Sequence, residues 1–338
     1  MLHELPEFEH VDARSVEEAV GWLGQYGDRA KILAGGTDLL GLMKDRITGP
    51  KMPLPDLLVN IKTIPGFDRI ECPDTGGATI GPTTTLFEIE THPVLQTKYP
   101  GLVEAARSVA TTSIRYVGTI GGNLCQRPWC WYFRHPDFVC FKRGGRQCFA
   151  IPGHNRTYFS ILNLGVCVMS HPSDVAVALL ALNARIAIAS PRGHRTVAAD
   201  QFFLGPRSVP ETVLAPDELV LGIELDEPVP GSRSAYVKHR PRGTWDFALS
   251  AVGVSVTQQG GRCTEARLIL GGVAPFPYRA KAAEEVLRDQ HLDARTIERA
   301  AEAAVASSRP LLMNGYKVAL TRALVGRALA GVAESATM

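Results

Sequence analysis

Gly118-Thr-Ile-Gly-Gly-Asn123 opens the stretch of sequence around which the chain is organised. Paired glycines allow unusual backbone angles and let backbone amides come close to a phosphate group. Five of the seven cysteines follow, and the stretch ends at His171-Pro-Ser-Asp174, just before an alanine- and leucine-rich segment. A phosphate-type loop combined with a cluster of cysteines is hard to explain by packing alone.

The overall composition narrows the class of protein. With 338 residues, the chain is long enough for two or three domains that fold without disulfides. A net charge of +2 is too small to predict nucleic acid as a partner. No apolar run reaches the roughly 18 to 20 residues of a membrane span, and the acidic N-terminus lacks a signal-peptide pattern. We therefore expect no membrane span and a cytoplasmic protein, unless a signal-bearing partner exports it to the periplasm.

Helix and strand signals alternate on the N-terminal side of this stretch. Ser15 can cap a helix over residues 14–27, which a strand at Lys31-Ile-Leu-Ala34 and a helix from Asp38 to Met43 follow. Short strands and helices continue to about residue 228. Strands followed by helices, at about 278–288, 294–307 and 315–331, then predict a separate α+β domain.

Residues 127–160 show little periodicity and are rich in aromatic, basic, glycine and cysteine residues. We interpret them as an irregular insertion that a bound metal could order. Its basic side chains could neutralise an anionic cluster or meet an acidic partner, or they could simply face solvent. These residues are Arg127, Arg134, Lys142, Arg143 and Arg146.

A second glycine pair occurs in Ala34-Gly-Gly-Thr-Asp-Leu39, between a predicted strand and a predicted helix. It matches neither the Gly-x-Gly-x-x-Gly fingerprint nor the Walker sequence, and a plain strand-to-helix turn would also explain it. Two such loops, each beside a hydroxyl residue, would suit the two phosphates of a dinucleotide.

The clustered cysteines predict a metal site in a reducing compartment rather than a set of disulfides. Four thiolates complete either a zinc or an iron–sulfur site. The spacing matches neither a zinc ribbon nor a ferredoxin, and it alone leaves zinc ahead of iron–sulfur. Cys72 and Cys263 lie in strand-like contexts and are expected to pack. His171 could be a ligand or a base, although a turn or core histidine is the simpler interpretation.

Five motifs, in this order, resemble those of the FAD-binding medium subunits of molybdenum hydroxylases. That family includes xanthine dehydrogenase, carbon monoxide dehydrogenase, aldehyde oxidoreductase and 4-hydroxybenzoyl-CoA reductase. The resemblance runs nearly end to end. It rests on Ala34–Leu39, Ile114–Asn123, Ser173-Asp174, Tyr236-Val-Lys-His-Arg240 and Leu270-Gly-Gly-Val-Ala-Pro275.

The resemblance implies an α+β protein in three parts. A two-subdomain FAD-binding fold of the vanillyl-alcohol-oxidase (PCMH) type would occupy residues 1–62 and 63–228. A C-terminal α+β domain of the CO dehydrogenase flavoprotein type would occupy residues 229–338. The glycine loops would hold the pyrophosphate through backbone amides, Asp174 would meet the ribose or adenine end, and Lys238 would approach the isoalloxazine ring. The implied FAD contacts are Ala34, Gly35, Gly36, Thr37, Asp38, Leu39, Thr111, Gly118, Thr119, Gly121, Gly122, Asn123, Asp174 and Lys238.

The cysteine insertion, at about residues 125–167, resembles that of a narrower group whose flavin subunits carry an extra [4Fe-4S] cluster. This group includes the periplasmic aldehyde oxidoreductases and, more distantly, the benzoyl-CoA-type reductases. The resemblance therefore shifts the expected metal from zinc to iron–sulfur. The implied ligands are Cys130, Cys140, Cys148 and Cys167, with Cys125 as an uncertain fifth candidate.

The expected function is an FAD and [4Fe-4S] electron-transfer subunit of a heterotrimeric molybdenum-containing aldehyde oxidoreductase. Its implied partners are a large molybdenum-cofactor subunit and a small subunit with two [2Fe-2S] clusters. A subunit of a 4-hydroxybenzoyl-CoA reductase-like or xanthine dehydrogenase-like enzyme is the nearest alternative. Two further alternatives are a zinc-stabilised scaffold without catalytic function and a stand-alone flavin reductase, for which no matching motif occurs.

Overall fold

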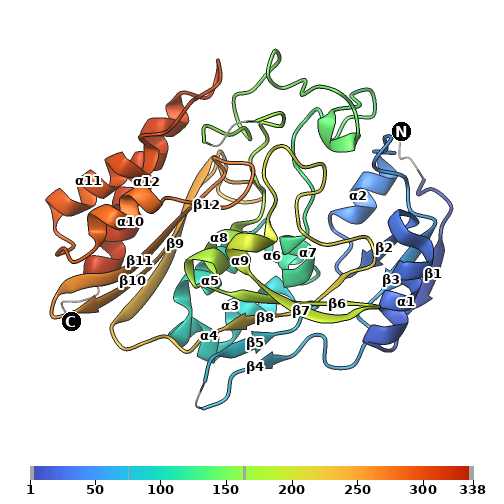
Figure 1. The fold of residues 1–338 in the computed structure, drawn as a ribbon, viewed down its shortest axis with the longest axis horizontal. Helices are drawn as coiled ribbons and strands as arrows, with labels where there is room; N and C mark the ends of the chain where they lie inside the picture. Colours follow the sequence, from blue (N-terminus) through green and yellow to red (C-terminus); the bar gives the residue numbers. More distant parts are fainter. Residues whose placement is uncertain (1–3, 75, 163–164, 335–338) are drawn as a thin grey trace.

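The computed structural model describes residues 4–74, 76–162 and 165–334 (Figure 1). The outermost residues of the expected first and third parts, and residues 163–164 of the expected insertion, lie outside these ranges. Each of three separate β-sheets takes its strands from one region of the chain. None of the described helices is long and apolar enough to cross a membrane.

The first sheet is parallel and has the order β1-β3-β2. Its strands are β1 (Glu9–Asp12), β2 (Ala30–Leu33) and β3 (Leu57–Asn60). The expected helices are present as α1 (Val16–Tyr26) and α2 (Leu39–Lys44), and the Ser15 side chain caps α1 as predicted. Strand β1 was not expected, because its mostly exposed Glu-His-Val-Asp sequence carries no apolar pattern.

The second sheet is antiparallel, with the order β4-β5-β8-β6-β7. Its strands are β4 (Ile70–Glu71), β5 (Ala78–Ile80), β6 (Arg185–Ser190), β7 (Gly193–Ala198) and β8 (Leu219–Leu225). The chain between β5 and β6 forms the helices α3 (Leu86–Thr91), α4 (Pro93–Lys98), α5 (Pro100–Ser108), α6 (Thr112–Arg115), α7 (Ile120–Leu124) and α8 (Asp174–Ala181). Helix α9 (Ala199–Phe202) follows β7.

The third sheet is also antiparallel, in the order β12-β11-β10-β9. Its strands are β9 (Ser232–His239), β10 (Ser250–Gln259), β11 (Arg262–Gly271) and β12 (Tyr278–Arg279). Helices α10 (Lys281–Leu287), α11 (Ala294–Val305) and α12 (Tyr316–Glu334) form a layer beside it, while α5 and α8 lie between it and the second sheet (Figure 1). The helix expected from residue 278 therefore starts later, because Tyr278 and Arg279 pair with β11.

Helix α8 fixes the centre of the molecule, since all eight of its residues are buried. It packs against the third sheet at two glycines. A Cβ atom on Gly253 would lie 3.0 Å from the Val177 carbonyl oxygen, and one on Gly271 would lie 2.7 Å from the Val177 side chain. This close packing holds Asp174, the first residue of α8, in a defined position between the second and third sheets.

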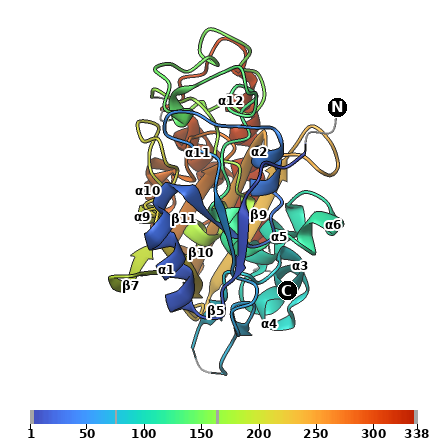
Figure 2. The same ribbon diagram turned by 90° about the vertical axis from the view of Figure 1, so that its right-hand side faces the viewer.

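The cysteine insertion is irregular, as expected, apart from the 3-10 turn η2 (Phe141–Arg143). In Figure 1 it lies in green between α2 and the C-terminal helices, and Figure 2 shows it at the same upper end of the molecule. The Arg143 side chain donates to the carbonyl oxygen of Thr48 at 2.6 Å, and buried Lys317 of α12 donates to that of Phe159 at 2.9 Å. The insertion therefore links the N-terminal region to the C-terminal domain.

Candidate functional site

A cavity of about 1550 Å³ lies where the three regions meet. Every expected FAD contact except Thr111 lines it. Thr111 caps α6 instead, while Ala110 and Ile114 on either side of it do reach the cavity. The cavity thus gathers residues that lie more than two hundred positions apart in the sequence, such as Ala34 and Lys238.

The first glycine loop has the features of a phosphate cradle. A Cβ atom on Gly35 would lie 2.3 Å from the Val117 carbonyl oxygen, so only glycine allows the two glycine loops to touch here. Gly36 adopts a left-handed conformation with φ of 70°. Within the described residues, the N–H groups of Gly35, Gly36 and Thr37 donate no hydrogen bond. Consecutive free amides of this kind form an anion-binding concavity.

The second glycine loop differs from the expectation that its amides hold a phosphate. The N–H groups of Gly118, Ile120 and Gly121 donate to main-chain oxygens, and that of Gly122 donates to the Thr119 hydroxyl at 3.1 Å. Gly118 donates to Ile114 at the end of α6, Ile120 and Gly121 donate to Thr84 and Pro82 after β5, and the Gly122 bond is part of the cap that Thr119 gives to α7. Most amides of this loop are therefore engaged within the protein; among its described residues the N–H group of Thr119 donates no hydrogen bond, so the run of consecutive free amides is the one from Gly35 to Thr37.

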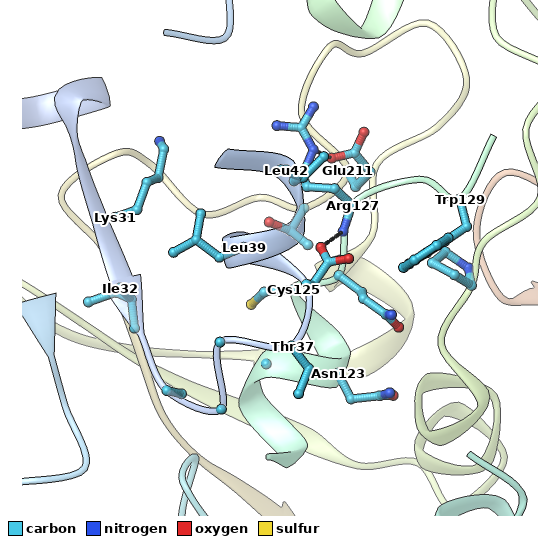
Figure 3. A pocket seen from close by; sticks show the side chains of 18 of the residues that line it. Lys31, Ile32, Thr37, Leu39, Leu42, Asn123, Cys125, Arg127, Trp129 and Glu211 are labelled. Carbon is cyan, nitrogen blue, oxygen red and sulfur yellow. Dashed lines mark hydrogen bonds and ion pairs between the residues drawn. The ribbon is translucent and has the colours of Figure 1, made fainter. Parts of the chain in front are cut away.

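Asp38 connects the first glycine loop to the insertion. Its carboxylate accepts the backbone N–H of Arg127 at 3.1 Å and forms an ion pair with the Arg134 guanidinium at 2.6 Å. Arg134 also lies 4.3 Å above the ring of Trp129. Figure 3 shows Arg127, Trp129 and Cys125 along the same wall of the cavity. The insertion thereby fixes the loop that carries the free amides.

Asp174 and Lys238 form a buried ion pair. Their carboxylate oxygen and Nζ atom are 2.6 Å apart, and the side chains are only 5% and 4% exposed. The Tyr236 hydroxyl donates to the other carboxylate oxygen at 2.6 Å, and burial raises the pKa of Tyr236 well above its ordinary value. Asp174, expected at the ribose or adenine end of FAD, and Lys238, expected near the isoalloxazine ring, thus contact each other in the structure; their separate roles toward FAD stay a prediction. The involvement of Tyr236 was not predicted from the sequence.

A second, much smaller cavity adjoins the first. It is lined by all four expected cluster cysteines, and Cys130 also lines the large cavity. Backbone N–H groups two or three residues further along the chain point at the sulfur atoms of Cys130, Cys140, Cys148 and Cys167. Such bonds stabilise a thiolate over a thiol. Cys148 and Cys167 lie close enough to interact, and this contact lowers the pKa of the Cys148 thiol and raises that of Cys167.

Cys125 does not share this environment. It lines the large cavity and not the cysteine cavity (Figure 3). Its side chain is exposed, and no backbone amide in the described part of the chain is directed at its sulfur atom. Within the described residues, no three His, Cys, Asp or Glu side chains converge to hold a single metal ion.

Buried positive charge surrounds the cysteine cavity. Arg143 is 1% exposed and donates to the carbonyl oxygens of Thr48, His135 and Phe138, without an ion pair to any described carboxylate. Lys142 is also buried and forms an ion pair with Glu211 at 3.2 Å. Arg146, in contrast, is exposed. An anionic group in the cavity would compensate the excess positive charge. A metal cluster bound by four cysteine thiolates would be such a group.

His171 lines neither cavity. Its imidazole packs edge-on against Phe203, and its Nδ1 atom accepts the N–H of Ser173 at 3.3 Å. Burial lowers the pKa of His171 to about 3, so the ring is neutral. This environment is that of a core histidine rather than a metal ligand or a base.

Comparison with known protein families agrees with this geometry. Residues 6–228 match the FAD binding domain in molybdopterin dehydrogenase. The chain belongs to the family of FAD-binding medium subunits of molybdenum hydroxylases. Residues 235–332 match the CO dehydrogenase flavoprotein C-terminal domain. This medium subunit is therefore the flavoprotein component of an oxidoreductase, with FAD as its cofactor and the expected α+β architecture.

Individual relatives of this medium subunit cover nearly its whole length. The aldehyde oxidoreductase FAD-binding subunit PaoB of Escherichia coli (strain K12) is 32% identical over 305 residues, which is 89% of this chain and 91% of that protein. The carbon monoxide dehydrogenase medium chain of Hydrogenophaga pseudoflava is 30% identical over 328 residues, or 96% of both chains. In a solved structure of carbon monoxide dehydrogenase from H. pseudoflava, one chain superposes with a TM-score of 0.77, at 30% identity and over 98% of this chain and 99% of that one.

Proposed function

We propose that this chain is the FAD and [4Fe-4S] electron-transfer subunit of a heterotrimeric molybdenum-containing aldehyde oxidoreductase. One observation carries the proposal. A cavity lined by two glycine loops and a cavity lined by four cysteines share a wall at Cys130. Two redox groups bound there would be neighbours, so electrons could pass between them within one chain.

On the flavin side, the residues of this chain bind and orient the cofactor. The free amides of Gly35, Gly36 and Thr37 offer hydrogen bonds to the pyrophosphate, and the ion pair of Asp38 with Arg134 holds their loop in place. Lys238 brings a positive charge to the cavity wall, where Asp174 holds its ammonium group. Bound FAD supplies a centre that takes up electrons singly and releases them as a pair.

On the cysteine side, the donor set fits an iron–sulfur cluster. Four thiols face one cavity, each with backbone amides directed at its sulfur, and buried Lys142 and Arg143 provide compensating positive charge. Hydrogen bonds to the sulfurs and nearby charge are features that stabilise clusters and set their potentials. We assign Cys130, Cys140, Cys148 and Cys167 as the ligands, since Cys125 faces the flavin cavity.

The aldehyde assignment rests on the similarity to PaoB, whose name describes an aldehyde oxidoreductase subunit. The similar carbon monoxide dehydrogenase chain is named as a medium chain, which supports assembly with a larger and a smaller subunit. We propose that the larger partner binds the molybdenum cofactor and the smaller one binds the [2Fe-2S] clusters that deliver electrons to this chain. An external acceptor then receives them.

Cysteine variants of the purified heterotrimer test the proposal. Cys140→Ser should lose the [4Fe-4S] signal and most of the iron that belongs to this chain, since one of the four ligands is removed. Cys125→Ser should retain the cluster, and Cys72→Ser, a partly buried cysteine that directly follows β4, serves as a matched control. Loss of the cluster from Cys125→Ser but not from Cys140→Ser would contradict the ligand assignment.

Turnover of the same variants separates two roles of the cluster. If the cluster relays electrons, a folded and FAD-loaded Cys140→Ser heterotrimer should reduce its acceptor much more slowly than wild type does. Full activity without the cluster would exclude the relay and leave a structural role. Zinc in place of iron in the wild-type protein would instead favour the zinc-stabilised scaffold.

A further inference from the structure

A buried ion pair lies between the cysteine cavity and the flavin cavity. Lys142 lines the cysteine cavity with only 2% of its side chain exposed, and its Nζ atom lies 3.2 Å from the Glu211 carboxylate. Glu211, 5% exposed, lines the flavin cavity and forms a second ion pair with Arg127 at 2.6 Å. Figure 3 shows Arg127 and Glu211 next to each other at the edge of that cavity. The ammonium group of the pair thus belongs to a residue that lines the cysteine cavity, and the carboxylate to a residue that lines the flavin cavity.

Positive charge at this position acts directly on the sulfur atoms. Lys142 lines the same small cavity as the four cysteines, and almost none of its side chain reaches solvent. Electrostatic interactions are strong in a buried site, because little water screens them. A charge that stabilises a thiolate here also stabilises any further negative charge that the four cysteines enclose.

Reduction of a cluster in this cavity adds one electron without breaking a bond, so the enclosed charge becomes more negative by one. Lys142 stabilises the reduced form and raises the reduction potential. Glu211 opposes it, both through its own negative charge and by drawing the ammonium group toward the flavin cavity. The two members of the pair thus act on the potential in opposite directions.

We propose that the Lys142–Glu211 pair sets the reduction potential of the [4Fe-4S] cluster and thereby the direction of electron flow between the two cavities. The inference rests on the proposed function, because it needs a cluster bound by the four cysteines. Lys142 and Glu211 are positioning residues, which act through charge and not by ligation.

Three other charged or titratable groups lie near the cavity, and each bears on how the cluster potentials of the Lys142 and Glu211 variants are compared. Arg143 is held by main-chain oxygens of Thr48, His135 and Phe138, so its contribution stays constant when Lys142 or Glu211 is replaced. The buried ring of His171 is neutral, because burial lowers its pKa to about 3. Arg127 is the second cation on Glu211, and its guanidinium also donates to the Lys142 carbonyl oxygen at 3.3 Å, a contact that does not involve the side chain at position 211.

A redox titration of the holoenzyme, followed by the electron paramagnetic resonance signal of the reduced cluster, tests the inference. Lys142→Met should shift the midpoint potential to more negative values, and Glu211→Gln should shift it to more positive values. The midpoint potential of the double variant should lie between those of the two single variants. Arg146→Met, which removes an exposed charge from the same insertion, is the matched control and should leave the potential unchanged.

Iron and flavin contents of each variant distinguish the possible failures. Unshifted potentials, or shifts of equal sign, in variants with a full complement of iron would overturn the role of the Lys142–Glu211 pair while leaving the proposed function intact. A wild-type holoenzyme without a cluster in this chain would overturn both. If Lys142→Met does not assemble a cluster, Glu211→Gln alone decides, since only a positive shift agrees with the inference.

Discussion

Replacing Gly35 with alanine tests whether contact between the two glycine loops builds the flavin site. The new Cβ atom would lie 2.3 Å from the Val117 carbonyl oxygen, 3.0 Å from the Val117 carbonyl carbon and 3.1 Å from the Gly118 Cα atom. All three are backbone atoms, which cannot rotate away as a side chain would. The loops must therefore move apart, at the expense of the cavity that lies between them.

Moving the loops apart should destabilise the site by the amount typical of an overpacked methyl group, about 1–3 kcal/mol of free energy. If the FAD-bound form carries this cost, the affinity for FAD falls by about 5-fold to 150-fold. Titration of the flavin-free chain with FAD, followed by flavin fluorescence, measures the change. Gly41→Ala is the matched control, because a Cβ atom there meets nothing within 4 Å and alanine favours the helix α2. An affinity of Gly35→Ala within twofold of that of Gly41→Ala would refute the reasoning.

Three further predictions concern other contacts of the site and of the insertion. Asp174→Asn leaves the Lys238 ammonium buried without its partner, so the urea unfolding midpoint should fall, by an amount equivalent to about 3–5 kcal/mol, and adding Lys238→Met should recover part of it. Arg134→Met frees Asp38 and should weaken FAD binding in the fluorescence titration by about 1.5–3 kcal/mol, roughly tenfold or more. Burial lowers the pKa of Lys317 from 10.5 to about 7, so between these pH values the unfolded chain binds the extra proton. The stability of wild type relative to Lys317→Met should therefore rise with pH in that window, by up to about 1.4 kcal/mol per unit, in urea unfolding series at several pH values.

Local sequence patterns predicted most helices and strands of this fold. Ser15 and the apolar stripe behind it define α1, and the largely apolar run of Leu219–Leu225 defines β8. Strands with little apolar character, such as β1 and the exposed β7, were missed, because pairing with neighbouring strands and not side-chain burial forms them. The pairing of β5 with β8 bridges a long separation in the chain, which no local pattern encodes.

The sequence predicted those parts of the site whose chemistry depends on residue type alone. It did not predict the parts that depend on contacts between distant segments of the chain. The glycine pairs and the cysteines identify the walls of the two cavities from the sequence. The ion pair of Asp174 with Lys238 could not be found in this way, because the third sheet must first place β9 against α8. Glu211 carries no local signal at all, since its partner Arg127 lies in the insertion.

The iron, zinc and flavin contents of the purified wild-type chain, together with its visible spectrum, test the central claim most directly. We predict about one FAD and about four iron atoms per chain, with a broad iron–sulfur absorption beneath the flavin bands. Replacing Cys140 with serine should remove the iron and leave the flavin. A chain that binds FAD without iron, or that binds zinc instead, would contradict the claim that the four cysteines hold a redox cluster beside the flavin.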